Sequence, residues 1–221
     1  MTSKRRHREN IAAGNLALFA VKSQLNEFLL FRKDFYVDVA NKKRSAGSPL
    51  YLLARPSFHT YVGHTIDFTS LGFLFERTGY AKTFDALHLS QLSYQDLVKI
   101  DEFRNTTAVE VQKEIEKLDH TKQDSSLGNI EKAVGPYLIA VMGMLVVGLA
   151  KRARDDEKVY QDAFSSLQAA LEIELKVWWH IRPHPLISLK EPEPKFRKES
   201  LPAMPELLVE ALENLDRESA E

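Results

Sequence analysis

Three charged side chains occupy positions where the apolar patterns of this chain predict hydrophobic residues: Arg32, Arg104 and Glu174. If the helices that carry them pack together, a guanidinium and a carboxylate meet inside the protein, where an unpaired charge is very costly. Such a pair has two uses. It fixes the register of the helices, or it lines a polar pocket that binds a small anionic ligand. We expect the first use and keep the second as the alternative.

Histidines are the other residues that could support chemistry, as metal ligands. They form two local pairs, His59 with His64 and His180 with His184. The second pair is interrupted by Pro183, so it is not the one-face helical pair of an H-E-x-x-H zinc site, and no acidic residue lies within either pair to act as a general base. The four histidines are therefore weak metal candidates, and we expect no metal or other cofactor.

Familiar catalytic signatures are absent from the sequence. The chain contains no cysteine, which excludes disulfides, thiolate zinc sites and cysteine nucleophiles. It contains no G-x-S-x-G elbow and no glycine-rich phosphate loop. Its formal net charge is −1, from 30 basic and 31 acidic residues, so nucleic acid is not indicated as a partner. We assign no catalytic residue, and these features favour a non-enzymatic role.

Long segments without glycine or proline predict the helices that position these residues. From 8 to 42 the only interruption is Gly14, and an apolar stripe with alternating three- and four-residue steps follows one face. The stripe contains Ile11, Leu18, Val21, Leu25, Phe28, Phe35 and Val39, with Gly14 and Arg32 in its gaps. A second heptad seam contains Tyr160, Phe164, Leu167, Leu171 and Trp178, with Glu174 in the missing position.

The remaining segments complete a predicted all-α fold, a bundle of long antiparallel helices with short accessory helices and an irregular aromatic loop near 49–64. Short helices are expected at 70–78 and 83–90, and a longer one from Ser93, where S-x-x-D is a helix-start pattern. After Pro136 no proline occurs until Pro183, so this region forms either one long helix or two helices with a bend near 151–157.

The sequence divides into four expected regions: a basic tail at 1–10, the helical bundle domain at 11–182, a proline-rich linker or strap at 183–205, and an acidic amphipathic helix at 206–221. The last helix has an apolar face suited to docking, formed by Leu207, Leu208, Ala211 and Leu215. Polar residues interrupt the apolar run that follows the basic start, so we expect no cleaved signal peptide and a cytoplasmic protein.

The most apolar stretch is residues 133–150, which contain no charge between Lys132 and Lys151. Its length is at the lower limit for a membrane span, and the positive residues at 151–154 oppose the required topology. We expect a core helix that is the most buried segment of the chain; a membrane span or reversible insertion are the alternatives. The apolar residues of this core or span are Pro136, Leu138, Ile139, Val141, Met142, Met144, Leu145, Val146 and Leu149.

These patterns favour a cytoplasmic scaffold, adaptor or regulatory subunit that acts through protein–protein contacts. We expect its partner to be another protein or a second copy of the chain, because sustained apolar seams are typical of coiled-coil oligomers. One alternative is a membrane-associated protein that uses 133–150 as an apolar span. A second is a ligand-binding or enzymatic bundle with a polar site near Arg104 and Glu174.

Overall fold

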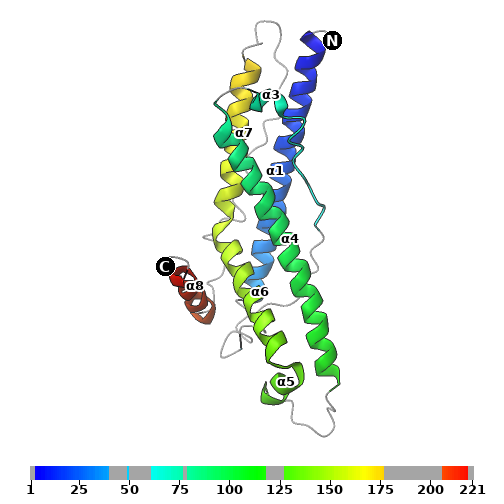
Figure 1. Cartoon of the computed structure of the whole chain (residues 1–221), viewed down its shortest axis with the longest axis vertical. Helices are drawn as coiled ribbons and strands as arrows, with labels where there is room; N and C mark the ends of the chain where they lie inside the picture. The colour runs from blue at the N-terminus through cyan, green and yellow to red at the C-terminus, as the bar shows by residue number, and fades with distance from the viewer. Residues whose placement is uncertain are drawn as a thin grey trace. The chain divides into compact units, whose positions relative to one another are not determined.

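The computed structural model of the chain describes residues 3–39, 49, 61–76, 79–117, 127–176 and 206–218. These residues form seven helices and no strand, which confirms the predicted all-α bundle (Figure 1). The helices are α1 (Ser3–Val39), α3 (Gly72–Phe75), α4 (Ala81–Glu116), α5 (Leu127–Val134), α6 (Pro136–Asp155), α7 (Glu157–Lys176) and α8 (Glu206–Glu218).

The described residues group into two compact units, each built from segments that are far apart in the sequence. The first unit belongs to 1–30, 61–95 and 155–196, and the second to 31–60, 96–154 and 197–221. Helices α1 and α4 each contribute residues to both units. The units therefore cut across the regions expected from the sequence, which followed chain order.

The first unit is built on the start of α1, the start of α4 and the whole of α7, with the short α3 beside them (Figure 1). In this unit the predicted α1 stripe is buried from Leu18 to Phe28. The Phe28 ring packs on Tyr160 of α7 with centroids 5.1 Å apart, and Leu167 and Leu171 of the predicted second seam are fully buried. Trp178, the last residue of that seam, lies outside the described residues.

Gly14 interrupts the apolar stripe of α1 at a point where a neighbouring side chain leaves little room for a larger residue. A Cβ atom at Gly14 would lie 2.7 Å from Cδ2 of Leu171, which is fully buried on α7. Overpacking costs about 1–3 kcal/mol, and alanine gains about 1 kcal/mol over glycine in a helix. Gly14→Ala should therefore lower the free energy of unfolding by up to about 2 kcal/mol in urea titrations.

The matched control for this substitution is the same change in a Leu171→Ala background, where the opposing methyl groups are gone. There Gly14→Ala should raise the free energy of unfolding by about 1 kcal/mol. A stabilising effect of equal size in both backgrounds would show that Leu171 does not restrict the space at Gly14.

One apolar cluster of the second unit is made by α4, α5 and α6. Its buried members are Val111, Val134 and Met142, and the half-buried residues packed on them are Ala108, Ile115, Ile130, Leu138, Ile139 and Leu145. In α8, Leu208 of the predicted face is buried and Ala211 and Leu215 are half-buried, while the side chain of Leu207 lies outside the described residues. Leu212, which was not predicted, is buried as well. Asp216 of α8 pairs with Arg154 of α6, with 3.0 Å between Nη2 and Oδ2.

Several helix boundaries differ from those expected. Helix α1 begins at Ser3, so most of the expected basic tail at 1–10 is helical; its residues are good helix formers, and Arg5 Nε donates to Glu9 Oε1 at 2.9 Å one turn away. Helix α3 is shorter than the predicted 70–78. The proline-rich segment at 183–205 and all of the aromatic loop except Pro49 and 61–64 lie outside the described residues.

The predicted helix start at Ser93 is wrong, because Ser93 lies inside the continuous helix α4. Its hydroxyl instead donates to Asp156 Oδ2 at 2.6 Å, so the side chain links α4 to the residue that precedes α7. Asp156 is also the break between α6 and α7, so the region after Pro136 forms two helices and not one.

Candidate functional site

The charged candidates Arg32 and Arg104 both lie in the second unit, and both are almost completely buried. Arg104 Nη2 lies 2.9 Å from Asp101 Oδ1, one turn earlier on α4. Glu174 belongs to the first unit, is half-buried, and accepts a hydrogen bond of 2.9 Å from the Tyr80 hydroxyl. A guanidinium and a carboxylate thus meet in the interior, with Asp101 rather than Glu174 as the carboxylate.

The Arg104–Asp101 pair is formed within a single helix, at i and i+3. It therefore neutralises a buried charge but does not by itself align two helices. Arg104 Nη2 also donates to Asn105 Oδ1 at 3.3 Å. The Arg104 side chain is therefore held by neighbouring side chains of its own helix. Arg32 adds a third buried charge to the same unit, from α1.

Of the four histidine candidates only His64 is described; His59, His180 and His184 lie outside the described residues. His64 Nε2 is 3.6 Å from Glu27 Oε1, and the His64 ring meets the edge of the Phe19 ring with centroids 5.7 Å apart. No group of three or more metal-binding side chains occurs in the described parts of the chain.

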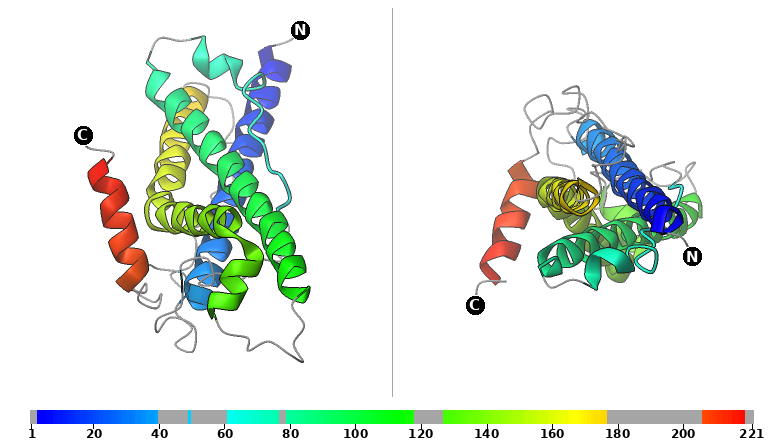
Figure 2. Two further views of the ribbon diagram at one scale, coloured as in Figure 1. Left: turned by 60° about the horizontal axis from the view of Figure 1, so that its bottom comes forward. Right: turned by 90° about the horizontal axis from the view of Figure 1, so that it is seen from above.

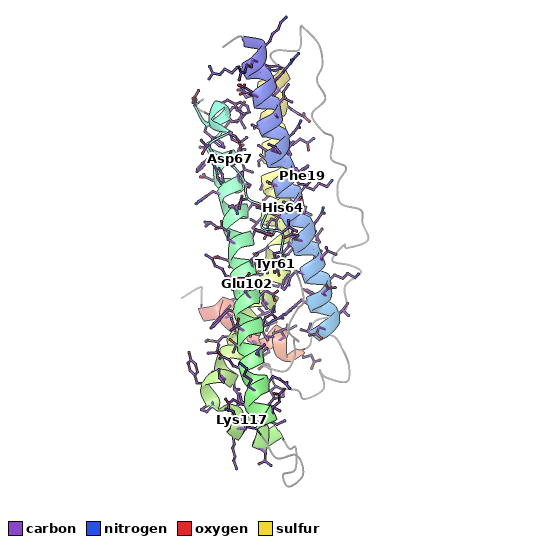
Figure 3. All side chains as sticks on the ribbon, turned by 90° about the vertical axis from the view of Figure 1, so that its right-hand side faces the viewer. Phe19, Tyr61, His64, Asp67, Glu102 and Lys117 are labelled. Atoms are coloured by element: carbon purple, nitrogen blue, oxygen red, sulfur yellow. The ribbon has the colours of Figure 1, made fainter. Side chains whose placement is uncertain are left out.

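A buried polar cluster in the first unit was not predicted. Gln24 Nε2 donates to Gln91 Oε1 at 3.0 Å and to the His64 carbonyl at 2.8 Å, and Ser90 Oγ donates to Gln24 Oε1 at 3.2 Å. Gln91 Oε1 also accepts the Ile66 amide at 2.8 Å. The cluster holds the segment from Tyr61 to Asp67 beside α1 and α4, and Figure 3 shows its course through the labelled His64.

A second set of contacts holds the same segment. The buried Tyr94 hydroxyl donates to Glu27 Oε2 and accepts the Gly63 amide at 3.3 Å, while Glu27 Oε1 accepts the Val62 amide at 3.4 Å. Burial, and then the hydrogen bond to Glu27 and its negative charge, raise the pKa of Tyr94 well above its ordinary value. Phenol, carboxylate and imidazole thus contact one another here. Because Tyr94 and Glu27 also accept backbone amides of the segment, the arrangement fastens it to α1 and α4.

Tyr94→Phe tests this fastening through its pH dependence. Losing the hydroxyl should lower the free energy of unfolding by about 1–2 kcal/mol near pH 8. Because the folded state raises the pKa of Tyr94, the unfolded chain releases this proton first, from about pH 10. The contribution of Tyr94 is therefore present below about pH 10 and lost above it, at about 1.4 kcal/mol per pH unit.

Urea titrations from pH 8 to pH 11.5 measure this effect as the difference between wild type and Tyr94→Phe. The difference should shrink as the pH rises. A constant difference across the range would mean that Tyr94 does not hold its proton more tightly in the folded state.

The apolar stretch at 133–150 is not the most buried part of the chain, contrary to expectation. Only 28% of the most apolar 18-residue window of α6 is buried, and Tyr137 and Met144 are 76% and 68% exposed. Of the nine apolar residues expected in the core, Val141, Met142, Val146 and Leu149 are buried, Leu138, Ile139 and Leu145 are half-buried, and Pro136 and Met144 are exposed.

Helix α6 holds only part of the uncharged stretch. Gly135 has φ +82 and separates α5 from α6, so the uncharged stretch is divided and the chain turns there (Figure 2). The uncharged part of α6 runs from Pro136 to Ala150, and these 15 residues span about 22 Å. One side of α6 packs on its unit, and the opposite side bears Tyr137, Ala140, Met144 and the half-buried Val147, which we name the α6 face.

The chain matches no protein-family model, and no curated protein or solved structure is significantly similar to it. Its function must therefore be argued from the α6 face and from the contacts described above.

By length and composition alone, α6 is the one helix of the described segments that could cross a membrane. Core helices of soluble proteins pass the same test, but they are mostly buried and α6 is not. Tyr137, Ala140, Met144 and the half-buried Val147 follow one another at three- and four-residue steps and form an apolar strip. Such a strip is typical of a surface that contacts a protein or a lipid bilayer.

Proposed function

We propose that this chain is a cytoplasmic, non-enzymatic scaffold, adaptor or regulatory subunit that binds protein through the α6 face. The observation that carries the proposal is the exposure of Tyr137 and Met144, 76% and 68%, on the most apolar of the described helices. Tyrosine and methionine are enriched at protein–protein interfaces, and charged residues are depleted from the interface core. The α6 face has that composition.

A protein partner fits this face better than lipid does. About 22 Å of uncharged helix is shorter than the roughly 30 Å hydrocarbon layer of a membrane. Lys132 and Lys151 bound the stretch, so extending the span would bring a charge into the layer. The other side of α6 includes the buried Met142, which belongs to one apolar cluster with Val111 of α4 and Val134 of α5.

The test is the size of the complex that the chain forms in a native cell extract. The wild-type chain should elute well above the 25.2 kDa of one copy. Met144→Glu introduces a charge at the centre of the α6 face, and it should shift the chain to the mass of one copy, because an unpaired carboxylate in an apolar interface is costly.

Gln112→Glu is the matched control, since it places the same charge on an exposed position of α4. It should leave the elution unchanged. A wild-type chain that elutes as one copy, or a Met144→Glu chain that elutes like wild type, would refute the proposal.

Membrane association is the second candidate function, favoured by the composition of α6. Extraction of cell membranes with alkaline carbonate separates the two. The scaffold predicts release into the supernatant, and a spanning α6 predicts that the chain stays in the pellet.

A further inference from the structure

We infer that the partner of the α6 face is a second copy of this chain, packed antiparallel about a two-fold axis that passes beside Met144. The inference rests on the proposed function and adds the identity of the partner and the register. Its basis is that the α6 face is complementary to itself when one copy is reversed, and not when both copies run in the same direction.

The first complementarity is between Tyr137, at one end of the α6 face, and Lys151, one turn beyond its other end. Tyr137 lies seven residues before Met144 and Lys151 lies seven residues after it, each about 10.5 Å from the axis along α6. In the antiparallel register each Tyr137 therefore faces Lys151 of the second copy. An ammonium group over a tyrosine ring is attractive, and symmetry produces the contact twice. A parallel pair would instead place Lys151 against Lys151.

Lys151 is placed to make this contact. Its side chain is 39% exposed, and its Nζ lies 3.6 Å from Asp216 Oδ1 of α8. Arg154 approaches the same carboxylate more closely, at 3.0 Å from Oδ2 and 3.2 Å from Oδ1. Asp216 therefore keeps a cationic partner when the ammonium group of Lys151 turns to a ring on the second copy.

The middle of the face supplies the second complementarity. Ala140 lies four residues before Met144 and Gly148 four after it, so the antiparallel register places two small residues against each other. A Cβ built at Gly148 meets no atom of its own chain within 4 Å, so that side of α6 is open. Small residues facing each other let two helices approach closely, and Met144, an adaptable side chain, fills the space at the axis.

Cysteine crosslinking of the purified full chain tests this register without interference, because the sequence contains no cysteine. Under mild oxidation, Met144→Cys should form a disulfide between the two copies, since the two thiols meet at the axis. The covalent mass of the denatured chain should then rise from that of one copy to that of two. Tyr137→Cys alone should not crosslink, because its two copies would be about 21 Å apart. A mixture of Tyr137→Cys and Lys151→Cys should crosslink.

Lys113→Cys, exposed on α4, is the control that should stay at the mass of one copy. A mixture of Ala140→Cys and Gly148→Cys repeats the test if Met144→Cys folds poorly by circular dichroism. Crosslinking of Tyr137→Cys to itself would overturn the antiparallel register. A purified chain that sediments as one copy and forms no crosslink at position 144 would overturn the inference that the partner is a second copy. If the purified chain sediments as one copy, while in extract the wild-type chain elutes well above 25.2 kDa and the Met144→Glu chain does not, the proposed function holds and this inference alone fails.

Discussion

Replacing Asp101 with alanine should lower the free energy of unfolding by about 3–5 kcal/mol. Asp101 is fully buried, and its Oδ1 lies 2.9 Å from the guanidinium of Arg104, which is buried as well. Without the carboxylate, Arg104 keeps a positive charge in a region that water does not reach. Chemical denaturation followed by circular dichroism measures the effect.

Two further variants distinguish the cost of leaving the Arg104 charge in the interior from the cost of removing a carboxylate side chain from α4. Glu102→Ala removes a neighbouring carboxylate that is exposed on α4 (Figure 3), and it should change stability by less than about 0.5 kcal/mol. Asp101→Leu combined with Arg104→Met removes both charges and should recover most of the loss. If the double variant is as unstable as Asp101→Ala, charge burial is not the cause.

Replacing Phe28 with alanine should lower the free energy of unfolding by about 3–5 kcal/mol. The Phe28 ring is fully buried on α1 and packs on the buried ring of Tyr160, so its removal leaves a cavity in the core of the first unit. Thermal or urea denaturation measures the loss, and Phe28→Leu, which leaves a smaller cavity, should lose less.

Phe19→Ala is the matched control on the same helix, because the Phe19 ring is more than half exposed and meets only the His64 ring among the ring contacts described. It should cost less than about 1 kcal/mol. Equal losses for Phe19→Ala and Phe28→Ala would mean that the stripe containing Phe28 is not the core of this helix.

The sequence predicted the buried face of α1 well because the physical signal is strong there. Leu18, Val21 and Phe28 recur at three- and four-residue steps over a long segment, and only one face of a helix shares that spacing. The structure buries the whole stripe from Leu18 to Val39, including the charged Arg32 in its gap. A sustained period therefore identified both the helix and its side.

The sequence did not predict the exposure of α6, because hydropathy reports the composition of a segment and not which of its sides other helices cover. Nothing in the pattern marked Tyr137 and Met144 as outward and Val146 as inward, since all three are apolar. The turn at Gly135, with φ +82, was also missed as the point that divides the apolar stretch.

The polar partners were missed for a related reason. Gln24 adjoins the apolar stripe of α1, and periodicity alone treats such a residue as facing solvent, although it is buried against Gln91 of α4. Asp101 lies three residues before Arg104, but a local carboxylate gives no pattern that distinguishes a buried pair from a surface one. Which polar side chains meet depends on the packing of distant segments.

The most direct test of the central claim, that α6 presents its apolar face to protein, is photo-crosslinking from position 137 in intact cells. A photoreactive phenylalanine analogue in place of Tyr137 should give protein adducts larger than the 25.2 kDa chain. The same probe in place of Lys113 on α4 should give none. Adducts to lipid alone, or no adduct from position 137, would contradict the account.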